Sequence, residues 1–109
     1  MTSFNQRETA YETEFAHREE LKFRAREKAV RALATWAAER LRKTGEAADA
    51  YAAEVVAADV THPELEATLD LVAAALVPAG SGKAEVGEMM NRLFAQADAA
   101  VWGSPPPPR

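Results

Sequence analysis

Residues 80–83 read Gly-Ser-Gly-Lys, the part of this sequence closest to a motif that performs chemistry. In a phosphate-binding P-loop, the backbone N–H groups of a glycine-rich loop and a lysine side chain hold the phosphates. The complete pattern needs glycine at position 77 and serine or threonine at position 84, where this chain has Val77 and Ala84. No strand precedes the run to aim such a loop. We therefore interpret it as a turn before a helix, although a helical bundle could still bind a nucleotide weakly near Lys83 or Arg92.

The other reactive side chains do not form a recognisable catalytic or metal site. The two histidines, His17 and His62, fall on different predicted elements and have no adjacent set of acidic ligands. Cysteine is absent, which excludes thiolate metal sites and disulfides. No Ser–His–Asp order can be assembled, and the many carboxylates are typical of solvated helix faces. The sequence predicts a protein that is not an enzyme and that needs no metal or cofactor.

Three aromatic residues near the N-terminus have the spacing of a binding surface. Phe4, Tyr11 and Phe15 lie at i, i+7 and i+11, which stacks them on one face of a helix. Almost all other positions of this segment are polar or charged. Large aromatic side chains often anchor protein interfaces. The pattern therefore predicts that the segment binds another protein.

Two interpretations of residues 1–22 stay open. Burying three aromatic side chains stabilises the segment by less than the ordering of about 20 residues costs, and isolated helices of this length are marginal. The segment would then be mobile in the free protein and become helical when a partner covers it. Alternatively, it is the N-terminal part of a long first helix that packs on the rest of the domain.

The remaining residues have the start and stop signals of amphipathic helices and no strand signal. The first helix starts near Ser3 and continues to Lys43, and the second covers about residues 46–59. The third begins with Thr61 as its N-cap and ends at the turn of residues 78–82, before a fourth over about residues 83–101. The expected core follows helical spacing: Val30, Leu33, Trp36, Ala37, Leu41, Tyr51, Val55, Val56, Leu65, Leu69, Val72, Leu76, Val86, Met90, Leu93 and Phe94.

These elements predict an all-α fold. A small four-helix bundle at residues 23–102 follows a mobile N-terminal helical segment at residues 1–22. Hydrophobic residues make up 48% of the chain, but many are alanine and 7% of all residues are aromatic, which indicates a thin core. Residues 103–109 contain four prolines and are expected to be disordered.

The charge of the chain limits its partners. A formal net charge of −4 argues against nucleic acid, because phosphate binding needs a clustered basic surface. The first residues are polar, unlike a signal peptide, and no stretch approaches the roughly 18 apolar residues of a membrane span. We expect a soluble, cytoplasmic protein without direct membrane insertion.

The order of residues in the first half of the chain is similar to that of the zeta subunit family of alphaproteobacterial F-type ATP synthases. The similarity covers about the first 60 residues and is weak after Asp59, where residues 60–63 replace an acidic turn. The matching residues are Phe4, Arg7, Glu8, Ala10, Tyr11, Glu12, Phe15, Ala16, His17, Glu20, Leu21, Phe23, Trp36, Ala37, Ala38, Glu39, Leu41, Thr44, Gly45, Ala50, Tyr51, Ala52, Glu54, Val55, Val56 and Asp59.

This resemblance implies a specific function. Family members are four-helix bundles whose mobile N-terminal segment enters the catalytic head between an α and a β subunit and reaches toward the γ shaft. There it blocks rotation in the direction of ATP hydrolysis, at the cytoplasmic face of the membrane. Carried over to this chain, the inhibitory contact consists of Phe4, Arg7, Glu8, Tyr11, Glu12, Phe15 and His17.

Two alternatives of the same fold remain. One is a docking or assembly module that binds without inhibiting, and the other is a bundle that binds a small molecule such as a nucleotide. The sequence leaves self-association open.

Overall fold

The computed structural model describes the backbone of residues 2–102 and the side chains of residues 14–101. Every regular element in this part of the chain is helical, which confirms the all-α prediction. The elements are α1 (Thr2–Arg40), α2 (Gly45–Thr61), α3 (Leu65–Leu76), the short 3₁₀ helix η1 (Val77–Ala79) and α4 (Lys83–Trp102). The prediction of a disordered tail at residues 103–109 lies outside the described residues.

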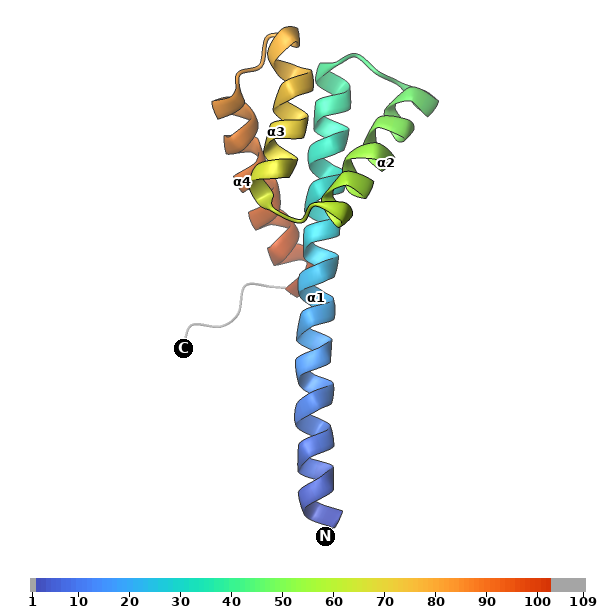
Figure 1. The fold of residues 1–109 in the computed structure, drawn as a ribbon, viewed down its shortest axis with the longest axis vertical. Helices are drawn as coiled ribbons and strands as arrows, with labels where there is room; N and C mark the ends of the chain where they lie inside the picture. Colours follow the sequence, from blue (N-terminus) through green and yellow to red (C-terminus); the bar gives the residue numbers. More distant parts are fainter. Residues whose placement is uncertain (1, 103–109) are drawn as a thin grey trace.

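The helices form a bundle at one end of the molecule, and α1 extends far beyond it (Figure 1). Within the bundle, α1 packs against α2 and α4, while α3 contacts both α2 and α4. At about 1.5 Å per residue, the 39 residues of α1 span roughly 58 Å. The molecule measures 63 × 31 × 25 Å, so α1 determines its long axis. Each helix in the described part of the chain is too short or too polar to cross a lipid bilayer.

A core of branched aliphatic and alanine side chains holds the bundle together. Its largest fully buried members are Val30, Leu33, Val55, Val72, Leu76 and Val86. These six were expected in the core, and Trp36 packs against its edge, partly buried. The prediction for Leu65 is wrong, because this side chain is 48% exposed. Since α3 begins only at Leu65, that residue lies at the rim of the bundle.

The first helix ends at Arg40, three residues before the predicted end. The Lys43 N–H donates to the Ala38 carbonyl (2.9 Å), and the Arg42 N–H donates to the Glu39 carbonyl (3.0 Å). These two bonds form a Schellman motif, whose penultimate position needs a left-handed backbone. Arg42 occupies that position with φ 61°, a conformation that glycine adopts more easily. The hydrogen bonds of the motif therefore hold a non-glycine residue in a costly conformation.

The junction between α2 and α3 differs from the prediction. Thr61 is the last residue of α2, and its hydroxyl donates to the Ala57 carbonyl at 3.1 Å. The N-cap of α3 is Glu64, in an extended conformation. Pro63 explains the shift, because a proline disfavours helical backbone at the preceding residue. His62 accordingly ends α2 outside the helical region, and Thr61 is not the cap of α3.

Candidate partner-binding site

The N-terminal half of α1 projects from the bundle, and no other described helix lies beside most of it (Figure 1). We call residues 2–24 the projecting half, because Ala25 is the first fully covered residue of α1 among the described side chains. All side chains from position 14 to 20 are exposed. The interpretation in which this segment packs on the rest of the domain therefore does not hold for these positions. Whether the segment frays in the free protein stays a prediction.

Ion pairs within the projecting half support its helix. Arg18 pairs with Glu14 at 3.0 Å and Arg24 pairs with Glu20 at 2.9 Å, both four residues apart, and Lys22 pairs with Glu19 at 3.3 Å. Each such pair stabilises an isolated helix by about 0.2–0.5 kcal/mol. Between residues 14 and 24, the helix is thus supported by local ion pairs, while most side chains there are exposed.

Phe15 is the predicted anchor whose side chain the structure describes, and it is 59% exposed. The helical register agrees with the predicted stripe, since at about 100° per residue Phe4, Tyr11 and Phe15 fall within roughly 40° of each other. His17 is also exposed, but it lies about 200° around the helix from Phe15. The structure therefore places His17 on the face opposite the aromatic stripe.

The other predicted contact residues are placed by the backbone alone. All of them belong to α1, and their side chains lie outside the described part: Phe4, Arg7, Glu8, Tyr11 and Glu12.

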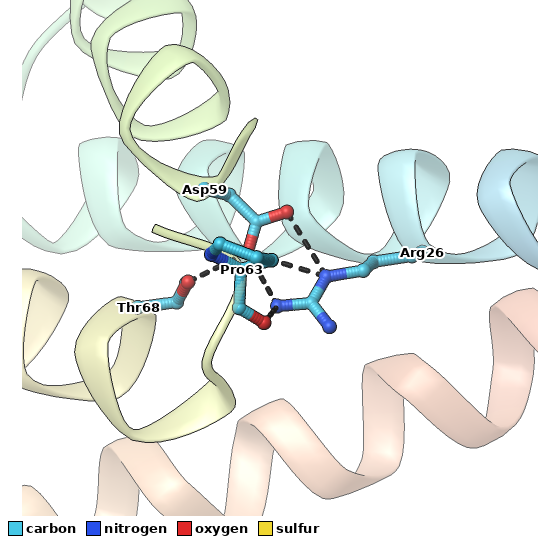
Figure 2. Close-up of polar contacts among 4 residues, drawn as sticks. All are labelled: Arg26, Asp59, Pro63 and Thr68. Atoms are coloured by element: carbon cyan, nitrogen blue, oxygen red, sulfur yellow. Dashed lines mark hydrogen bonds and ion pairs between the residues drawn. The ribbon is translucent and has the colours of Figure 1, made fainter. Parts of the chain in front are cut away.

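A partly buried polar cluster anchors α1 at the base of the projecting half (Figure 2). Arg26 donates from Nη2 to Oδ1 of Asp59 at 2.7 Å and from Nε to Oδ2 at 3.0 Å. Its Nη2 also donates to the Pro63 carbonyl, and the Thr68 hydroxyl donates to Asp59 Oδ1 at 2.7 Å. We call these four residues the Arg26 cluster. It connects α1, the end of α2, the following turn and α3.

The electrostatics of the Arg26 cluster favour the charged pair. Asp59 is 7% exposed, and burial alone would raise the pKa of its carboxyl. The hydrogen bonds from Arg26 and Thr68, with the charge of Arg26, more than offset burial and lower this pKa below its ordinary value. Removing one partner of such a pair is costly, because the other charge stays partly buried.

A second set of contacts joins the opposite end of α1 to α4. The Arg40 guanidinium lies over the Trp36 ring, 5.1 Å from its centroid. The same side chain donates to the Ser81 hydroxyl at 3.3 Å and pairs with Glu85 at 2.8 Å. Together with the Arg26 cluster, these contacts fasten both ends of the part of α1 that lies within the bundle, residues 25–40.

Residues 80–83 form a turn and not a phosphate cradle. Gly80 has φ 105°, and the Ser81 N–H donates to the Leu76 carbonyl at 3.0 Å, which closes the end of η1. The Lys83 ammonium lies 2.8 Å from Asp70 and 3.7 Å from Glu66, so it already forms ion pairs with two carboxylates. This arrangement agrees with the interpretation of the run as a turn before a helix.

A family model for ATPase inhibitor subunit zeta matches residues 1–100 of the chain. The chain belongs to the ATPase inhibitor subunit zeta family. No curated protein and no solved structure matches it significantly.

This zeta-family assignment confirms the resemblance seen in the first half of the sequence. The match includes the projecting half and nearly all of the bundle, so it continues past Asp59, where the resemblance was weak. The family name describes inhibitor subunits of an ATPase, which supports a regulatory role rather than an enzymatic one and a partner within an ATPase complex. Among the described side chains of this zeta-family protein, no three His, Cys, Asp or Glu residues gather as a metal site would require.

Sequence reasoning did not identify the Arg26 cluster of this zeta-family protein. Its signal was present, since Asp59 lies four residues after Val55 on the apolar face of the second helix. Arg26 likewise lies four residues before Val30 on the core face of α1. A charge on an apolar face indicates that it needs a partner, because single buried charges are rare. Spacing within each helix does not show that these two charges pair with each other.

A hollow of about 400 Å³ between α1 and α4 bears on the small-molecule alternative. Its volume is within the usual range of ligand pockets, about 300–1,000 Å³. The lining includes Lys22, Arg26 and Asp98 beside Leu65 and Phe94. Arg26 pairs with Asp59 and Lys22 pairs with Glu19, so neither cation is available to a ligand without losing its partner. The hollow therefore gives the small-molecule alternative little support.

Proposed function

We propose that this zeta-family chain inhibits ATP hydrolysis by an F-type ATP synthase. The projecting half of α1 inserts into the catalytic head between an α and a β subunit and reaches toward the γ shaft. Inserted there, it blocks rotation in the hydrolysis direction, whereas rotation in the synthesis direction expels it. Association with the synthase would hold the chain at the cytoplasmic face of the membrane.

One observation supports this proposal most directly: the projecting half is a helix whose described side chains lack the cover that the bundle gives to the rest of α1. Phe15 is 59% exposed there. A fully buried aromatic side chain removes about 150–250 Å² of surface from water, so its exposure favours a partner that covers it. Peptide helices bind grooves through apolar residues spaced along one face, which is the spacing of Phe4, Tyr11 and Phe15.

The roles of the contact residues follow from their chemistry. We assign Phe4, Tyr11 and Phe15 as anchors that enter the head. Arg7 and Glu8 would form charged contacts that determine register and direction. The same proposal includes Glu12 and His17 in the contact, with His17 meeting a different wall of the cleft because it lies on the opposite face.

ATP hydrolysis by an alphaproteobacterial F-type ATPase, freed of its own inhibitor, tests the proposal. The assay compares the full chain, a version lacking residues 1–20, and a Phe4→Ala/Tyr11→Ala/Phe15→Ala variant. The truncated version keeps every buried core residue among those the structure describes, because these begin at Ala25. Val77→Ala is the matched control, since Val77 is 53% exposed in η1, far from the projecting half.

We expect the full chain and the Val77→Ala control to inhibit equally. Both N-terminal variants should lose inhibition by roughly 10-fold or more, because central aromatic anchors dominate interface energies. A full chain that binds the ATPase without slowing it would replace the inhibitor proposal with the docking or assembly alternative. A chain that neither binds nor inhibits would refute both.

A further inference from the structure

We infer that an apolar patch at the junction of the projecting half and the bundle makes a second contact with the catalytic head, beside the cleft that the rest of the projecting half enters. The patch consists of Phe23, Val56, Val60 and Pro63, and we call it the shoulder patch. The inference rests on the proposed function, since it assigns a further surface to the same partner.

The shoulder patch contains two large apolar side chains that are mostly exposed. Phe23 on α1 is 59% exposed and Val60 on α2 is 64% exposed. They border a cavity of about 130 Å³ that Val30, Val56 and Pro63 also line. Small-molecule pockets measure about 300–1,000 Å³, so this cavity is suited to a single inserted side chain. The patch therefore has the form of a socket between two apolar walls.

The Arg26 cluster fixes the two walls relative to each other. Arg26 and Asp59 both line the cavity, and their ion pair of 2.7 Å joins α1 to the end of α2 beneath the patch. Because these charges satisfy one another, the cavity does not offer them to a polar ligand. Apart from this pair and the exposed Glu27, the lining of the socket is apolar. The socket is thus pre-formed, which lowers the cost of binding a partner side chain.

The position of the patch connects it to the inserted helix. Phe23 follows Phe15 by eight residues on α1, which corresponds to about 12 Å along the helix axis. No glycine or proline interrupts α1, so both residues belong to one continuous helix. The end of α2, which carries Val60, lies beside α1 where the projecting half begins (Figure 1). If a partner protein encloses the projecting half in a cleft, the edge of that cleft therefore lies next to the shoulder patch.

The size of the patch determines which partner it fits. Covering one aromatic side chain and its neighbours buries on the order of 200 Å² on this chain. Stable interfaces bury about 1,200–2,000 Å² in total, roughly half on each partner. The shoulder patch is too small to hold a second copy of this chain alone, but it extends a larger interface that the projecting half supplies. We therefore assign its occupant as an apolar side chain of the head subunit that borders the cleft.

The test uses the full chain with the double substitution Phe23→Ala/Val60→Ala. Both residues are exposed and helical, and alanine is a good helix former, so the thermal midpoint should not fall. Binding to the inhibitor-free ATPase is measured by titration, together with ATP hydrolysis. We expect binding roughly 10- to 100-fold weaker than wild type, with Phe23→Leu closer to wild type and Val77→Ala unchanged.

A photo-crosslinking side chain at position 23 supplies an independent readout. It should form a covalent product with a head subunit, whereas the same group at position 77 should not. If wild type inhibits and the double variant binds equally well, the shoulder inference is wrong while the proposed function stands. If wild type binds without inhibiting and the double variant binds more weakly, the proposed function fails and the shoulder contact stands.

Two other outcomes overturn the inference. If the wild-type chain does not bind the ATPase, both proposals are wrong. Sedimentation velocity tests the other outcome. If the wild-type chain is a dimer, and the double substitution dissociates it without changing ATPase binding, the patch binds a second copy of the chain instead.

Discussion

Arg26 and Asp59 lie 33 positions apart in the sequence and form a two-bond ion pair, with Nη2 2.7 Å from Oδ1 and Nε 3.0 Å from Oδ2. The pair is located where α1 enters the bundle and near the C-terminal end of α2. Thr68 on α3 donates to the same carboxylate at 2.7 Å. Three helices therefore depend on one aspartate, and this relationship leads to the first two predictions.

Asp59→Asn should lower the free energy of unfolding by about 2 kcal/mol at pH 7. The substitution keeps the side-chain volume but leaves the partly buried Arg26 charge without its counter-ion. Urea unfolding followed by circular dichroism measures the change. Glu85→Gln is the control, because the Arg40–Glu85 pair is about half exposed and should contribute about 1 kcal/mol or less. Equal effects of the two variants would contradict the assignment of Asp59 as a buried anchor.

The contribution of the Arg26 cluster should also depend on pH. The folded-state pKa of Asp59 is lowered from 3.8, so on acidification the unfolded chain binds the proton first. The stabilisation is complete well above this ordinary value and is lost as the pH falls from about 5 through the folded-state pKa. The stability difference between wild type and Asp59→Asn should therefore be smaller at pH 3 than at pH 7. A difference that is constant over this range would show that the charge of Asp59 does not stabilise the fold.

Arg42→Gly should stabilise the protein by about 0.5–1 kcal/mol. Arg42 has φ 61° in the Schellman motif that ends α1, and glycine adopts this conformation without the steric cost of a Cβ atom. Thermal unfolding measures the gain. The same substitution at Arg31, an exposed position inside α1, should instead destabilise by about 1 kcal/mol. If both variants lose stability, the motif does not strain Arg42.

Tyr51→Phe should leave the stability unchanged or raise it by up to about 1 kcal/mol. The Tyr51 hydroxyl is buried and has no hydrogen-bond partner among the described residues, and burial first of all raises the pKa of this phenol. Deleting the hydroxyl thus removes a desolvation cost. Thr68→Val is the contrasting variant, because it removes a buried hydroxyl that does donate, to Asp59. It should destabilise by about 1–2 kcal/mol, and a loss of similar size for Tyr51→Phe would indicate a hydrogen bond to its hydroxyl.

Hydrogen exchange should separate the two halves of α1. Amides of the projecting half lack tertiary packing, so they should exchange with little protection, whereas amides near the buried Leu33 should exchange at the global unfolding limit. Adding the inhibitor-free ATPase should slow exchange in the projecting half. Equal protection along α1 in the free protein would contradict the prediction that this segment is mobile.

Local signals explain which parts of the fold were predictable from the sequence. The turns at Thr44-Gly45 and at residues 80–82 carry glycines, and the structure places Gly45 and Gly80 in left-handed conformations there. The junction before α3 was misplaced because the capping pattern at Thr61 competes with the backbone restriction from Pro63, and the proline prevails.

Contacts between distant residues explain what could not be predicted. Whether Leu65 is covered depends on the exact start of α3, which sequence patterns locate to within a few residues. The pairing of Arg26 with Asp59 depends on how α1 and α2 align, and helical periodicity within each segment does not determine that alignment. The helical register of Phe4, Tyr11 and Phe15 was predictable because it depends only on spacing within one helix. Its partner and the shoulder patch depend on surfaces of other elements or other chains.

The uninterrupted run of α1 has a mechanical consequence. A helix without glycine or proline transmits a sideways load along its axis, since kinks need such residues or a break in the hydrogen-bond ladder. From residue 4 to Arg26 the lever arm is about 33 Å at about 1.5 Å per residue. A rotating shaft that pushes on the tip would turn the helix about the point where Arg26 and Asp59 meet. In the proposed inserted state, the ion pair at the fulcrum and the core contacts of α1 would then resist that load together with the contacts to the partner.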